Sequence, residues 1–191
     1  MHYVALGCVG FLFFYLFDLN KVKFIHRIVN LLFPLGLVFL VYATLGIMRD
    51  FAPSFGFPLP VRVLLGMMAA VSLMMQFYVL FFALPFKKTY WFDGNVQHVI
   101  YAGVYGVCRH PGVPCFFFFY LFLWLTAGIH MILWAGLVWT VMDVIHVYVQ
   151  DRWMFPKTLT DYETYKQYTP FLIPTRHSLR ALSISEEGKP L

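Results

Sequence analysis

Long apolar runs, separated by short polar segments, constrain this chain more than any other feature. They cover His2–Phe17, Ile28–Met48, Val61–Leu84 and Phe116–Val149. One bilayer crossing takes roughly 20 apolar residues, so the last run, about 34 residues long, exceeds a single crossing. It contains a break at Gly128-Ile129-His130, and such a break predicts two helices joined by a very tight turn.

The composition excludes a soluble fold. Hydrophobic residues make up 61% of the chain and charged residues only 12%, whereas soluble domains carry about 25% charged residues. A chain of this length could not bury so much apolar surface in water. We therefore expect an all-α integral membrane protein with about five transmembrane helices. Residues 1–176 should form one multispan domain, with a catalytic half at about 86–176 and a polar tail at 177–191.

The first run could be a cleaved signal peptide, but no basic residue precedes it and no small-residue cleavage site follows it. It is therefore predicted to be a membrane-spanning helix. Basic residues gather in alternate polar segments: Lys21, Lys23 and Arg27; then Lys87, Lys88 and Arg109; then Lys157, Lys166, Arg176 and Arg180. The positive-inside rule then puts the N-terminus outside and the C-terminus in the cytoplasm. Anionic lipid accounts for the net charge of +5, so no nucleic-acid partner is expected.

A polar stripe interrupts the last apolar run. Asp143, His146 and Gln150 are spaced by three and four residues, which places them on one helix face beside Asp151. An ionised Asp near a helix centre costs roughly 2.5–3.5 kcal/mol, so it usually faces a cavity or a partner. The stripe indicates either a path to a cytoplasmic site or an Asp–His pair that joins two helices. A metal site is not expected, because no third ligand has a matching spacing.

Arg109-His110-Pro111 precedes the predicted helix pair. Proline suits a first helical turn, and the free amides there favour an anionic group. Arg109 can form a bidentate contact with a carboxylate or phosphate. His110 can donate or accept a hydrogen bond near neutral pH. An isolated arginine at a membrane boundary, however, more commonly extends its charge toward water.

These residues belong to a longer pattern. Gly103, Tyr105 and Arg109-His110-Pro111 are followed by the helix pair, by Gln150-Asp151, and by Tyr162-x-x-Tyr165 with Pro174. Over roughly Tyr101–Pro174 the pattern resembles the C-terminal half of the isoprenylcysteine carboxyl methyltransferase and phospholipid methyltransferase family. Members are small multispan membrane enzymes that use S-adenosylmethionine.

The resemblance implies a cytoplasmic cofactor pocket, built by the loop before the helix pair and by the C-terminal segment. It implies catalytic roles for Arg109 and Asp151. The cofactor-binding residues that it implies are Tyr105, Arg109, His110, Pro111, Gln150, Asp151, Tyr162 and Tyr165. A lipid-like methyl acceptor would enter the site sideways from the bilayer.

Two other functions stay open. Membrane sterol and steroid reductases have a similar Arg-His-Pro segment and a similar ending, but they use NADPH and usually have longer chains. The second possibility is a non-catalytic protein that keeps the family's fold. It stays open because the family usually has two glutamates where this chain has Gln150 and Asp151. Tyr162 and Tyr165 also have an alternative, as aromatic residues of the membrane interface.

Overall fold

The computed structural model describes residues 1–191 except 24, 84–96, 100–102, 177 and 180–191. The longer helices are α1 (His2–Lys23), α2 (Leu32–Asp50), α3 (Leu59–Phe81), α6 (Gly112–Ala127) and α7 (His130–Val149). The short elements are η1 (Arg27–Leu31), α5 (Val104–Val107), η2 (Gln150–Met154), α8 (Phe155–Thr158), α9 (Tyr162–Tyr168) and the two-residue strands β1 (Gln97–His98) and β2 (Leu159–Thr160). The predicted all-α class is confirmed, with one parallel pairing of β1 and β2 added.

Four helical segments of the described chain are long and apolar enough to cross a membrane: His2–Lys23, Arg27–Asp50, Leu59–Phe81 and His130–Thr158. α6 is apolar but has only 16 residues, a length of about 24 Å at 1.5 Å per residue. The hydrocarbon core of a bilayer is roughly 30 Å thick. The structure therefore supports four membrane-spanning helices by length and composition, one fewer than the sequence predicted.

The first helix continues six residues beyond its predicted end at Phe17 and stops at Lys23. The polar residues Asp18 and Asn20 are buried within it. Asn20 donates to Asn30 Oδ1 at 3.0 Å, and Asp18 contacts His146 of α7 and Gln150 of η2. The polar residues after Phe17 were predicted to lie outside the first helix. They are helical because their side chains form hydrogen bonds inside the protein.

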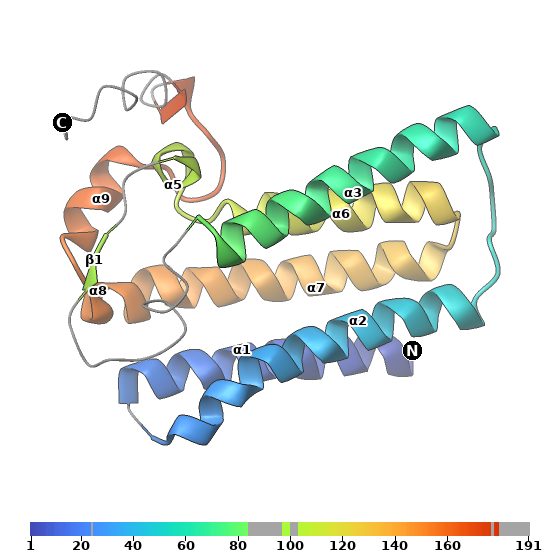
Figure 1. Ribbon diagram of the computed structural model, residues 1–191. Helices are drawn as coiled ribbons and strands as arrows, with labels where there is room; N and C mark the ends of the chain where they lie inside the picture. The colour runs from blue at the N-terminus through green and yellow to red at the C-terminus, as the bar shows by residue number, and fades with distance from the viewer. Residues whose placement is uncertain (24, 84–96, 100–102, 177, 180–191) are drawn as a thin grey trace.

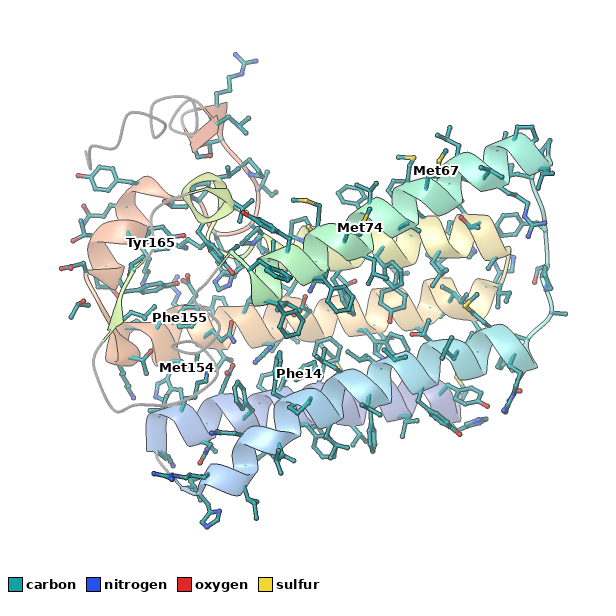
Figure 2. All side chains as sticks on the ribbon, in the orientation of Figure 1. Phe14, Met67, Met74, Met154, Phe155 and Tyr165 are labelled. Atoms are coloured by element: carbon teal, nitrogen blue, oxygen red, sulfur yellow. The ribbon has the colours of Figure 1, made fainter. Side chains whose placement is uncertain are left out.

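The helices pack in a layered order, α2–α1–α7–α6–α3, with α1 against both α2 and α7 and α6 against both α7 and α3 (Figure 1). Gly10 and Gly36 allow the close approach of α1 and α2, since a Cβ on Gly36 would lie 2.7 Å from the Gly10 carbonyl oxygen. Trp139 of α7 is fully buried, and its indole donates to Val4 O at 3.0 Å. Figure 2 shows Phe14 between α1 and α7, and Met67 and Met74 on the outer side of α3.

α6 and α7 are joined through Gly128, which has a left-handed φ of 72°. A Cβ at Gly128 would lie 1.9 Å from Phe55 O in the α2–α3 connection. The Gly128 carbonyl also accepts a 2.8 Å hydrogen bond from Ser54 N. Only glycine fits this combination of positive φ and close backbone contact.

The polar segments meet at one end of the helical layers. The α1–α2 connection lies there with β1, α5, α8 and α9, whereas the N-terminus and the α2–α3 connection lie at the other end (Figure 1). Lys87 and Lys88, on which the predicted topology also rests, lie outside the described residues, as does all of the predicted tail except Ser178 and Leu179.

Candidate functional site

Asp151 is the centre of a buried polar cluster at this end of the molecule. It lies in η2, a π-helical turn that continues α7, and it is 3% exposed. Its Oδ1 accepts a 2.6 Å hydrogen bond from the Tyr162 hydroxyl. Arg109 Nε lies 3.0 Å and His110 Nε2 3.5 Å from the same oxygen. Single π turns occur frequently at functional sites, and here one turns a carboxylate toward three partners.

The C-terminal segment fixes Arg109 and His110 through the backbone. Arg109 N donates to Pro170 O at 2.9 Å, and His110 N donates to Phe171 O at 3.3 Å. Arg109 Nη1 also donates to Lys166 O at 3.2 Å. Pro111 then occupies the N-cap of α6, so the helix start predicted at this proline is confirmed.

Aromatic rings enclose the imidazole of His110. Phe155 of α8 stacks on it with ring centroids 5.9 Å apart, and Phe171 meets it edge-on at 5.1 Å. The Phe155 ring also packs against the Tyr162 ring at 5.3 Å. Figure 2 shows Met154, Phe155 and Tyr165 in this end of the molecule. The cluster is therefore shielded from water as well as hydrogen-bonded.

The tyrosines of the predicted pattern connect its two halves. The Tyr165 hydroxyl donates to Tyr105 O at 2.5 Å, and the Tyr105 hydroxyl donates to Val79 O of α3 at 3.2 Å. Tyr162 and Tyr165 are each 3% exposed. Aromatic residues of a membrane interface would keep their hydroxyls in contact with water. Burial of both rings inside the protein favours their predicted place in the site.

Burial sets the charge states in the cluster. It lowers the pKa of His110, and the Asp151 carboxylate opposes this shift only in part. Burial and the hydrogen bond to Asp151 both raise the pKa of Tyr162. Burial also raises the pKa of the nearby Cys108 thiol to about 11. At neutral pH the cluster therefore holds a neutral imidazole, a neutral phenol and a neutral thiol around one guanidinium–carboxylate pair.

Two buried nitrogens of the cluster lack a hydrogen bond to any described residue: Arg109 Nε and His110 Nε2. Both lie within ion-pair distance of Asp151 Oδ1, but neither is aligned with that oxygen for a hydrogen bond. A buried polar group without a hydrogen bond costs about 1–3 kcal/mol, and the ion-pair contact with Asp151 offsets part of this cost. Two such groups side by side are an arrangement that a polar ligand would satisfy.

The structure separates Gln150 from this cluster. Its Nε2 donates at 2.6 Å to Oδ2 of Asp18 on α1, and His146 Nε2 lies 2.6 Å from the same oxygen. Two members of the predicted stripe thus take part in an Asp–His contact between helices, but the acid is Asp18 of α1 and not the stripe's own Asp143. Asp18 was not among the predicted site residues, and the only signal in the sequence was an acid at the end of the first apolar run.

Among the described residues no group of three or more His, Cys, Asp or Glu side chains is arranged to hold a metal ion. Comparison of the chain with protein-family models, with curated proteins and with solved structures finds no match.

Proposed function

We propose that this protein is a membrane-embedded methyltransferase that uses S-adenosylmethionine to methylate a lipid-like acceptor. The observation that carries the proposal is the meeting of Arg109, His110 and Tyr162 at one carboxylate oxygen of Asp151. These are the residues that the family pattern assigns to the cofactor, and they come from segments on either side of the α6–α7 pair.

The nitrogens of Arg109 and His110 that lack an aligned hydrogen bond fit an anionic group such as the carboxylate of the cofactor's amino-acid part. Asp151 would offset the positive charge of the sulfonium, and Tyr162 and Tyr165 would close the pocket. The cofactor supplies an electrophilic methyl group when bound. The aromatic side chains around His110 would keep water away from it.

Bilayer lipid reaches the sides of the helical layers, so an apolar acceptor need not pass through water. We propose five spans, with the 16-residue α6 as a short span, and a cytoplasmic site. The meeting of the basic α1–α2 connection with the segments that carry Lys157 and Lys166 at one end supports this orientation (Figure 1).

Ligand-dependent thermal unfolding of the detergent-purified protein tests the proposal. S-adenosylmethionine and S-adenosylhomocysteine should each raise the unfolding temperature, with about 2.7 kcal/mol of stabilisation at a hundredfold excess over the dissociation constant. Stabilisation by NADPH, and by neither sulfur compound, would instead identify a reductase. No stabilisation by any of the three would favour a non-catalytic protein.

A further inference from the structure

One face of α7 is left uncovered by the neighbouring helices. Its side chains are spaced by three and four residues, so they form one continuous apolar stripe along the helix. Each of them is at least 40% exposed: Trp134, Val138, Val141, Ile145 and Tyr148. We call this set the α7 stripe. In a chain of this composition, such a face lies against bilayer lipid.

Two cations lie where the α7 stripe ends. Arg152 of η2 is exposed, and its guanidinium carbon lies 5.7 Å from the centroid of the Tyr148 ring. Lys157 of α8 is also exposed, and its ammonium nitrogen lies 4.3 Å from the centroid of the Trp153 ring. Both distances fall within the range of about 6 Å for cation–π contacts. The rings therefore hold both charges at one end of the stripe.

The order of ring and cation is the same in both pairs. Tyr148 precedes Arg152 by four residues, and Trp153 precedes Lys157 by four. Because α7 runs toward the polar end of the molecule (Figure 1), each ring lies on the membrane side of its cation. Tyr and Trp rings favour the level of the lipid head groups. The two cations are thereby placed where lipid phosphates lie.

Neither cation is neutralised within the described part of the chain. No described Asp or Glu lies within ion-pair distance of Arg152 or Lys157. Lys21, at the same end of the molecule, differs because it interacts with Asp18. Basic side chains at a membrane surface attract anionic lipid, and these two have no acidic partner that competes with it.

We propose that an anionic phospholipid binds at this end of α7, with its head group at Arg152 and Lys157 and an acyl chain along the α7 stripe. The rings hold the cations in place before the lipid arrives, so binding restricts them little further. A second copy of the chain in the same bilayer would have the same orientation and bring its own two cations to this level, where like charges repel. The lipid is a bound component of the bilayer and not the methyl acceptor, so the inference does not rest on the proposed function.

The bound lipid would connect two segments of the candidate site. Arg152 follows Asp151 in η2. Lys157 lies in α8 with Phe155, whose ring stacks on His110. A head group that contacts both cations would hold these segments together. Anionic lipid should therefore raise the unfolding temperature, whether or not S-adenosylmethionine binds.

Native mass spectrometry of the detergent-purified protein tests the proposal with phosphatidylglycerol and phosphatidylcholine of identical acyl chains. Phosphatidylglycerol should bind more tightly, by about fivefold for each cation that it contacts. Arg152→Gln combined with Lys157→Gln should lower its affinity to that of phosphatidylcholine. Lys23→Gln combined with Arg27→Gln is the matched control, because it removes the same charge from exposed positions at the same end. This control should leave the affinity nearly unchanged.

An equal loss of affinity in the two double variants, or equal affinity of the unmodified protein for the two lipids, would overturn the proposal. Displacement of the lipid by soluble glycerol phosphate would also overturn it, because the acyl chain would then contribute nothing. So would a protein dimer that excludes phosphatidylglycerol, since the stripe would then be a contact between copies. If the double variant does not elute as one species, Lys157→Gln alone decides: it should lower the affinity by about fivefold, and unchanged affinity would refute the site.

Discussion

Tyr162 donates a 2.6 Å hydrogen bond to Asp151 across eleven residues of the chain, which ties α9 to the end of α7. Both side chains are buried, so the phenol compensates part of the cost of holding a carboxylate away from water. The same oxygen faces Arg109 and His110. This hydrogen bond therefore belongs to the fold and to the proposed cofactor site at once.

Tyr162→Phe should remove that hydrogen bond and keep the ring. We expect a loss of about 1.5–3 kcal/mol in the free energy of unfolding, the range for a hydrogen bond to a charged group. Thermal unfolding in detergent measures the change. Tyr168→Phe is the matched control, because Tyr168 is 62% exposed; an equal loss in both variants would contradict the prediction.

His110→Ala and Asp151→Asn should each weaken binding of S-adenosylmethionine by about 1–3 kcal/mol. Arg109→Lys should do the same, because lysine keeps the charge but lacks the planar guanidinium. Calorimetric titration of variants that elute as one species gives the affinities. Unchanged affinity in all three would show that the cofactor site lies elsewhere and that these side chains only hold helices together.

Acid should destabilise the fold through His110. Burial lowers its pKa in the folded protein, so the unfolded chain binds the proton more readily. The stabilising contribution is present above the unfolded pKa of about 6.5 and is lost as the pH falls through the folded value. The stability of the protein should therefore fall between pH 7 and pH 5 more steeply than that of His110→Gln. Parallel pH profiles would argue against a neutral buried imidazole.

Gly128→Ala should be strongly destabilising. The left-handed φ costs about 1–2 kcal/mol for a residue with a Cβ, and the new Cβ would also overlap Phe55 O. Gly66→Ala provides the control within α3. Its Cβ would meet only Thr126 Cγ2 at 3.7 Å, and alanine favours a helix by up to about 1 kcal/mol over glycine. The two unfolding temperatures should move in opposite directions.

Sidedness is testable with single cysteines in a protein whose Cys8, Cys108 and Cys115 have been replaced. Ile25→Cys and Ser54→Cys place thiols at exposed positions at opposite ends of the helical layers. In sealed vesicles an impermeant maleimide should label only one of the two. Labelling of both from the same side would refute the proposed topology.

The family resemblance implied one pocket for Arg109, His110, Asp151 and Tyr162. The structure brings these four side chains together, and their cofactor-binding role stays a prediction. The sequence did not predict the partner of Gln150. The resemblance implied that Gln150 and Asp151 act together, whereas the structure directs Gln150 to Asp18 and Asp151 to Tyr162. The π turn that carries both residues is a departure from the regular 3.6-residue repeat that periodicity does not reveal. Asp18 was predicted to mark the end of the first helix, because a charged residue after an apolar run usually lies at the membrane boundary. Its burial depends on the contact with His146, 128 residues away, which the local sequence does not show.

The π turn Gln150–Met154 has a consequence for how the two polar centres communicate. Gln150 donates a hydrogen bond to the Asp18 carboxylate of α1. Its neighbour in the chain, Asp151, forms an ion pair with the Arg109 guanidinium, just before α6. Any backbone rotation at their shared peptide bond alters both contacts together. A ligand that moves this peptide bond at one centre would change the geometry of the other, and the resulting change in affinity would be equal in both directions.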